Sequence, residues 1–252
     1  MKTTNYRVPC SKLKRMMKIA LASDLHDNPS KPVIELLQQE QPDLILIPGD
    51  LTDDTEIIKG GLPTLEFLRA CAEIAPTYYS LGNHEIACYH KGNPWRKPLP
   101  QPIPETFRHD VAETGAVLLD NESVRAGEFL ICGLTSGINR GKNEPNAAAL
   151  DSFCKETADI KLLLCHHPEY YRTYLADKDF DLIVSGHAHG GQWRFFNRGV
   201  YAPGQGLLAK DVAGVIGRNC VISRGLGDHT KIPRILNPRE LVIIEFGSSE
   251  TV

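Results

Sequence analysis

Short apolar strands alternate with helical segments in the first third of the chain, and this alternation limits the fold more than any other feature. Residues 17–23, 44–47 and 77–81 are apolar or β-rich runs. The first two lead through a polar loop into apolar positions at helical spacing, and the third closes on a polar motif. A strand that is apolar throughout is buried on both faces, so helices must cover the sheet. The pattern predicts an α/β fold.

Each of these strands is followed by a side chain that can bind a metal ion, and two later apolar runs, 161–165 and 182–184, repeat the pattern. In chain order the side chains are Asp24 and His26, Asp50, Asn83 and His84, His166, and finally His187 and His189. Ligands of open α/β sheets collect beyond the carboxyl ends of the strands. We therefore expect these groups to converge at one edge of the fold.

The donor types in this set indicate the kind of metal. Carboxylate, imidazole and amide oxygen suit manganese, iron, zinc or cobalt, and more than four ligands imply more than one ion. Taken singly, each residue has a simpler interpretation: Asp24 and Asp50 as helix caps, Asn83 as a turn residue, His26 and His166 as hydrogen-bonded histidines. The full set at successive strand ends favours a dinuclear metal site.

The remaining segments add less to the fold prediction. Residues 93–104 contain five prolines and can be neither helix nor central strand. The runs 192–196, 221–223 and 241–246 predict an added antiparallel sheet near the end of the chain. Residues 1–15 have no clear periodicity and are expected to form a loose N-terminal arm. The length of 252 residues is consistent with one domain over 1–252.

Composition bears mainly on partners and compartment. A net charge of -3 argues against a stable nucleic-acid partner. Seven cysteines, an odd number without a Cys-x-x-Cys pair, indicate free thiols in a reducing compartment, so we expect a cytoplasmic protein. No apolar run approaches the roughly 20 residues of a membrane-spanning helix.

The motifs Asp24-x-His26, Gly49-Asp50, Gly82-Asn83-His84-Glu85, His166 and Gly186-His187-x-His189, in this order, resemble those of the calcineurin-like metallophosphoesterases. The later segments 187–192, 201–206 and 223–227 resemble a bacterial subgroup, the YkuE/YaeI-type phosphoesterases. This resemblance implies a four-layer αββα fold: a β-sandwich of two mixed sheets flanked by α-helices, holding two metal ions (manganese, iron or zinc).

The resemblance also implies individual roles. Asp24, His26 and His189 would bind the first metal, Asn83, His166 and His187 the second, and Asp50 would bridge them. His84 would assist the leaving group, by donating a proton or by stabilising charge on the phosphoryl group. Asp53 would hold the His84 ring, or else be a solvated loop carboxylate. His166 and His167 are both candidates for one ligand position, and the resemblance favours His166.

The implied activity is hydrolysis of a phosphodiester, phosphomonoester or pyrophosphate bond in a small molecule, by attack of a metal-bridging hydroxide on phosphorus. The alternatives are a lipid-nucleotide pyrophosphatase, acting for example on a UDP-linked acylated sugar, and a metal-binding scaffold without catalysis. Two loop groups have open interpretations, as contacts to substrate or as solvated loops: Trp95, Arg96 and Lys97 in the first, Arg140 and Lys142 in the second. Leu207 and Leu208 either contact an apolar substrate or membrane or pack in the core, and packing is favoured.

Overall fold

The computed structural model describes the chain in eight stretches, which are residues 1–52, 62–88, 99–100, 103–137, 144–195, 198–202, 205–228 and 233–248. Several predictions concern residues outside these stretches. They are Asp53, the loop residues Trp95, Arg96 and Lys97, and the pair Arg140 and Lys142.

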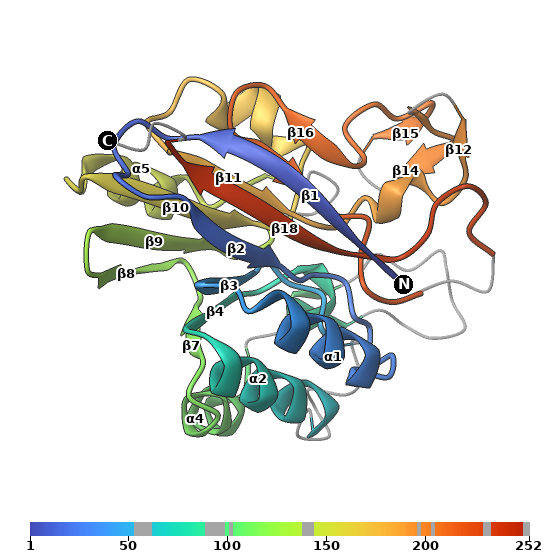
Figure 1. The fold of residues 1–252 in the computed structure, drawn as a ribbon, viewed down its shortest axis with the longest axis horizontal. Helices are drawn as coiled ribbons and strands as arrows, with labels where there is room; N and C mark the ends of the chain where they lie inside the picture. The colour runs from blue at the N-terminus through green and yellow to red at the C-terminus, as the bar shows by residue number, and fades with distance from the viewer. Residues whose placement is uncertain are drawn as a thin grey trace.

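The first of two six-stranded sheets contains the early strands and both ends of the described chain (Figure 1). Its order is β1 (Lys2–Pro9), β18 (Glu240–Gly247), β2 (Met17–Leu21), β3 (Leu44–Ile47), β4 (Thr77–Ser80) and β7 (Val117–Leu119). From β2 to β7 the strands are parallel. The last strand, β18, is antiparallel to β2 and parallel to β1, so the sheet is mixed.

The second sheet is also mixed. Its order is β16 (Gly214–Ile216), β17 (Cys220–Ile222), β11 (Leu182–Ser185), β10 (Ile160–Cys165), β9 (Phe129–Leu134) and β8 (Glu122–Ala126). The four central strands are parallel, and β16 and β8 are antiparallel edges.

Side chains alternate along the strands between two apolar layers, because successive strand residues point to opposite faces. On β2, Ile19 and Leu21 face the core between the sheets, whereas Ala20 faces outward. The outward layer of the first sheet packs against α1 (Lys31–Glu40), α2 (Leu62–Ile74) and α4 (Glu105–Glu113), which lie together below that sheet in Figure 1. The outward layer of the second packs against α5 (Ala147–Lys155) and the π-helical turn η1 (Tyr171–Leu175). The predicted αββα arrangement is confirmed.

Two predictions about the ends of the chain are wrong. Residues 2–9 are not a loose arm, because β1 pairs along its whole length with β18 and buries Val8 against the core between the sheets. The last strands form no separate antiparallel sheet: β17 extends the second sheet parallel to β11, and β18 lies between β1 and β2. Short apolar runs show burial but not pairing partners, so local patterning could not reveal these long-range pairs.

The remaining elements are short. They are α3 (Asn83–Ile86), the pair β5 (Ala87–Cys88) and β6 (Leu99–Pro100), the 3-10 turn η2 (His189–Gly191), the pair β12 (Arg194–Phe195) and β13 (Arg198–Gly199), and the pair β14 (Tyr201–Ala202) and β15 (Gly206–Leu207). Leu207 and Leu208 do not pack in the core, as was favoured, but are exposed at β15. Within the described stretches, no helix has both the length and the apolar character needed to cross a membrane.

Candidate metal centre

The strand ends singled out in the sequence meet at one edge of the sandwich. Asp24 and His26 follow β2, Asp50 follows β3, and Asn83 begins α3 directly beyond β4, all in the first sheet. The second sheet supplies the rest, from the ends of β10 and β11. The two sets touch directly, because the His187 backbone N–H donates to Asp24 Oδ1 over 2.8 Å.

One group of donors combines Asp24, His26 and His189. Nε2 of His26 lies 3.1 Å from Nε2 of His189, and the latter atom lies 3.5 Å from Asp24 Oδ1. The ligand-type atoms of the three residues all lie within 4.8 Å of one another. Asp24 and His26 are buried, so these polar groups face one another rather than water.

A second group combines Asp50, His166 and His187, with Asn83 beside them. Nε2 of His166 is 3.0 Å from Asp50 Oδ2, 3.2 Å from Asn83 Oδ1 and 3.2 Å from His187 Nδ1. Ligand atoms of Asp50, Asn83 and His187, from three different loops, therefore all lie close to His166 Nε2. All four residues are buried.

Asp50 stands between the two groups. Its Oδ2 lies 3.0 Å from His166 Nε2 in one group and 3.9 Å from His26 Nε2 in the other, while Oδ1 accepts the backbone N–H of His84 at 2.9 Å. A single carboxylate oxygen thus faces imidazoles of both groups, which is the placement a bridging ligand requires.

The donor set fits cations better than it fits a network of hydrogen bonds. Nδ1 of His166 donates to the Pro48 carbonyl over 3.1 Å, which turns Nε2 toward Asp50. Burial opposes the charged ring, but the Asp50 carboxylate outweighs it and raises the pKa of His166 to about 9, so a bound cation would replace the Nε2 proton. His26 and His189 bring two ring nitrogens within 3.1 Å of each other. Only one of two neutral rings can donate in such a contact, whereas a cation is bound by both lone pairs.

The electrostatics of the buried groups agree with this interpretation. Burial lowers the pKa of His187 and His189 well below the ordinary value, and neighbouring imidazoles lower it further, so both rings are neutral, the form that binds metal. Burial opposes ionisation of Asp50, but the facing imidazoles, His166 first, outweigh it and hold the Asp50 pKa well below its usual range. Asp50 is consequently a carboxylate.

The backbone at the centre is strained where the donors require it. Asp24, His26, Asp50, His187 and His189 all have φ between 45° and 66°, a left-handed conformation that L side chains rarely adopt. Such conformations cost of order 1–3 kcal/mol each and persist mainly at functional sites. The surrounding chain packs closely against these residues. A Cβ at Gly82, for example, would come within 2.2 Å of Asp50 Oδ1. Gly82 is thus required beside the carboxylate.

Glu85, to which the sequence assigned no role, anchors the loop that carries Asp50. Its Oε2 accepts the backbone N–H groups of Asp50 (3.0 Å) and Gly82 (2.8 Å). Its Oε1 accepts the Leu51 N–H (2.7 Å) and the Tyr79 hydroxyl (2.9 Å). Burial, together with the Asp50 charge, raises the pKa of Glu85 to about 7, while the donors favour its charged form. The Gly-Asn-His-Glu motif could have indicated this residue, because it places an acidic side chain directly after His84.

His84 lies at the centre without joining the second group. Its ring packs edge-on against His26, with centroids 4.8 Å apart, and its ligand-type atom lies within 4.8 Å of those of His26 and Asp50. The position agrees with a role beside the metals. Its expected partner, Asp53, lies outside the described residues.

The structure distinguishes the two adjacent histidines after β10. His166 faces Asp50, whereas His167 contacts Ser136 Oγ through Nε2 and Glu169 Oε1 through Nδ1, the latter over 3.1 Å. Ser136, two residues after β9, and Glu169, four residues after β10, were not singled out in the sequence. His109, on α4, is exposed and takes no part in the centre.

Arg234 is a further residue that sequence reasoning missed. Its Nη2 lies 3.2 Å from His189 Nδ1, and its guanidinium also donates to the carbonyls of Arg224 and Gly227, each over 2.6 Å. It therefore fixes the His189 ring from a segment 45 residues away along the chain. An isolated arginine after a turn gave no signal in the sequence.

Known proteins are similar to this chain in sequence. A family model described as calcineurin-like phosphoesterase matches residues 17–191. An uncharacterized metallophosphoesterase of Campylobacter jejuni is 30% identical over 200 residues, covering 76% of this chain and 48% of that protein. Phosphodiesterase YaeI of Escherichia coli K12 is 28% identical over 192 residues, covering 70% and 62%.

The chain spans about half the length of the first of these relatives. One solved crystal structure superposes with a TM-score of 0.52 at 11% identity, covering 85% of this chain and 91% of the other. At that identity the match shows similarity of fold alone.

Proposed function

Because the chain belongs to the calcineurin-like phosphoesterase family, we propose that it is a dinuclear-metal phosphoesterase that hydrolyses a phosphodiester, phosphomonoester or pyrophosphate bond. The observation that carries this proposal is the position of Asp50, whose one carboxylate oxygen faces imidazoles of both donor groups. A phosphodiesterase among the relatives favours the diester.

In this proposal Asp24, His26 and His189 hold one metal ion, Asn83, His166 and His187 hold the other, and Asp50 binds both. Manganese, iron and zinc all suit these ligands. When bound, a pair of such ions neutralises charge on the phosphoryl group and lowers the pKa of a water toward about 7.

The side chains of this protein then supply positioning and proton transfer. Glu85 and Gly82 hold the Asp50 loop in place, and Arg234 holds the His189 ring. His84, beside both groups, donates a proton to the leaving oxygen or stabilises charge on the phosphoryl group, an effect worth about 10²- to 10⁴-fold in rate. Asp53 would orient the His84 ring.

Further properties belong to the same proposal. The described cysteines with placed side chains are all free thiols, which supports a reducing compartment and a cytoplasmic location. The substrate would be a small phosphoester without a stable nucleic-acid partner, and 1–252 would be one domain. A non-catalytic scaffold is disfavoured by the presence of both Asp50 and His84 at the centre.

An activity screen tests the proposal. Phosphomonoesters, aryl phosphodiesters and nucleotide pyrophosphates, including a UDP-linked acylated sugar, are offered to the protein with manganese, iron or zinc. We expect turnover in at least one class, with His84→Ala slower by about 10²- to 10⁴-fold yet still binding metal. His109→Ala, on an exposed face of α4, serves as the matched control and keeps full activity. Metal binding without turnover of any substrate would instead support the scaffold.

A further inference from the structure

Large apolar side chains remain exposed on the short strands that follow the metal centre. Figure 1 shows β12, β14 and β15 grouped at the upper right, away from the helices that cover the first sheet. The segment Ile235–Leu236 adds to this group, because Ile235 bridges Trp193. We call the exposed residues Trp193, Phe195, Leu208, Ile235 and Leu236 the ribbon patch.

Strand pairing connects most of the ribbon patch. The β12–β13 register places Trp193 opposite Val200, whose N–H donates to the Trp193 carbonyl over 2.8 Å. The Leu208 N–H in turn donates to the Val200 carbonyl over 2.9 Å. Backbone contacts therefore link Ile235, Trp193, Val200 and Leu208 in succession across four chain segments.

Two leucines of the ribbon patch occupy costly backbone conformations. Leu208 has φ 56° and is 65% exposed, and Leu236 has φ 52° and is 71% exposed. A left-handed conformation costs about 1–2 kcal/mol for a residue other than glycine or asparagine. Neither side chain recovers that cost by burial within the chain. Exposed apolar residues that group together in this way mark interaction sites.

The charges around the ribbon patch are basic. Arg198 is paired opposite Phe195, Lys210 follows Leu208 by two residues, and both are exposed. Neither forms an ion pair within the described stretches, whereas the nearby Asp211 and Asp228 are paired with Arg172 and Arg234. The rim is therefore positive and uncompensated, although the whole chain has a net charge of -3.

We propose that the ribbon patch docks the protein on the surface of an anionic lipid bilayer. Exposed leucine and tryptophan flanked by Arg and Lys is the combination that enters the interface of anionic membranes. The Trp193 indole is suited to this position, since its N–H is already bonded to the Pro233 carbonyl over 2.9 Å.

Docking in this way would bring the metal centre close to the lipid headgroups. Trp193 follows His189 by four residues, and Arg234, whose guanidinium contacts the His189 ring, precedes Ile235 directly. The inference goes beyond the proposed function and does not depend on it, because vesicle binding is measured without turnover.

Co-sedimentation with vesicles tests the proposal, using the full chain with vesicles of phosphatidylcholine alone or mixed with phosphatidylglycerol. The test variant is Leu208→Asn/Leu236→Asn, since asparagine removes the apolar side chain and tolerates left-handed backbone. The matched control is Leu62→Asn, which removes a leucine that is 67% exposed on α2. Thermal unfolding and light scattering monitor folding and oligomeric state.

We expect the wild type and Leu62→Asn to bind phosphatidylglycerol vesicles, and the double variant to bind at least roughly tenfold more weakly without loss of thermal stability. Arg198→Gln and Lys210→Gln should each weaken binding by roughly fivefold at low salt. Failure of the wild type to sediment, equal binding to phosphatidylcholine alone, or equal binding by the double variant would overturn the proposal. So would a wild-type dimer that the double variant dissociates, because the patch would then join two copies of the chain.

Discussion

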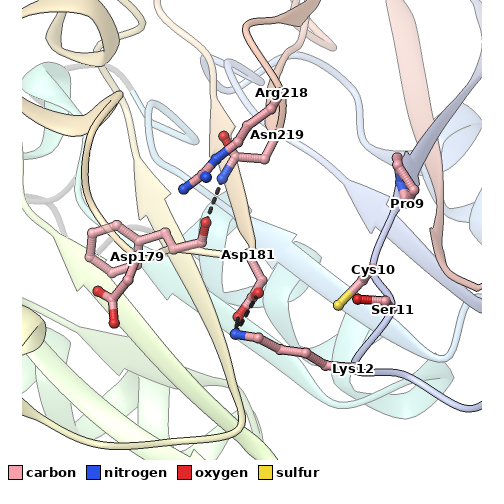
Figure 2. A pocket seen from close by; sticks show the side chains of 9 residues that line it. Pro9, Cys10, Ser11, Lys12, Asp179, Asp181, Arg218 and Asn219 are labelled. Carbon is pink, nitrogen blue, oxygen red and sulfur yellow. Dashed lines mark hydrogen bonds and ion pairs between the residues drawn. The ribbon is translucent and has the colours of Figure 1, made fainter.

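Charged and ionisable side chains lie at both edges of the sandwich. At the amino ends of the strands they contact groups of opposite charge, whereas at the carboxyl ends imidazoles face other imidazoles. At the amino ends of β10, β11 and β17, a cavity of about 410 Å³ is lined by charged and polar residues (Figure 2). There Lys12 pairs with Asp181 at 2.8 Å, and the Asn219 amide donates to the Phe180 carbonyl over 2.5 Å. At the carboxyl ends, ring nitrogens of His26 and His189 face each other at 3.1 Å.

This difference shows that the partners of the charged groups, rather than the presence of a cavity, distinguish the two edges. The charged residues that line the amino-edge cavity already contact groups of opposite charge or backbone carbonyls. Asp179, for example, forms an ion pair with Lys161 at 2.9 Å. Little is left to bind a ligand strongly. At the carboxyl edge, buried imidazoles and carboxylates from both sheets face one another, with His166 Nε2 at 3.0 Å and His26 Nε2 at 3.9 Å from Asp50 Oδ2, a donor set that suits a cation.

The largest effect is expected at the carboxyl end of β3. Asp50→Asn removes the charge and one carboxylate oxygen from the residue that faces both donor groups, so metal binding falls and hydrolysis of an aryl phosphodiester drops by roughly 10³-fold or more. Asp43→Asn is the matched control, because Asp43 precedes the same strand at the opposite edge, where it binds the Lys18 N–H over 2.8 Å. Equal losses in both variants would remove the distinction between the edges.

Glu85→Gln should have an intermediate effect. An amide would present N–H groups to backbone donors now bound by the carboxylate, which costs about 2–4 kcal/mol in the free energy of unfolding and loosens the Asp50 loop. Activity should fall by roughly 10- to 100-fold, as for other residues that orient metal ligands. Denaturant unfolding and steady-state kinetics measure the two effects. Glu66→Gln, exposed on α2, is the control, and a Glu85→Gln protein that matches it would show that the four contacts are dispensable.

The smallest effect is expected at the amino edge. Lys12→Ala breaks a pair whose lysine side chain is 49% exposed, so unfolding should change by less than about 1 kcal/mol, with metal content and turnover unchanged. Lys14→Ala, two residues further along the same loop, is the matched control for stability and turnover. A loss of activity specific to Lys12→Ala would mean that the cavity in Figure 2 contributes to function.

The apolar pattern of the sequence predicted the positions of buried strands, but it did not predict which distant strands pair. The buried runs at β2, β3, β10 and β11 lie where continuous apolar sequence indicated them. The pairing of β1 with β18 was missed, since the two strands lie more than 230 residues apart and neither sequence identifies its partner.

At the metal centre, the sequence could identify residues that lie at strand ends, because topology alone brings those together. It could not identify the residues that hold them. Glu85 acts through backbone groups of the Asp50 loop, and Arg234 reaches His189 from 45 residues away. The exposure of Leu208 was predicted wrongly, because a leucine in a loop has the same local sequence whether its side chain is buried or exposed.

Metal stoichiometry tests the central claim, that His187 and His189 serve two different ions joined by Asp50. Inductively coupled plasma mass spectrometry is applied to the wild type, His187→Ala and His189→Ala after loading with manganese or zinc and removal of free metal. The account predicts two ions per chain in the wild type and about one in each variant, since each substitution disrupts one donor group and leaves the other. One ion in the wild type, or loss of the same ions in both variants, would contradict it.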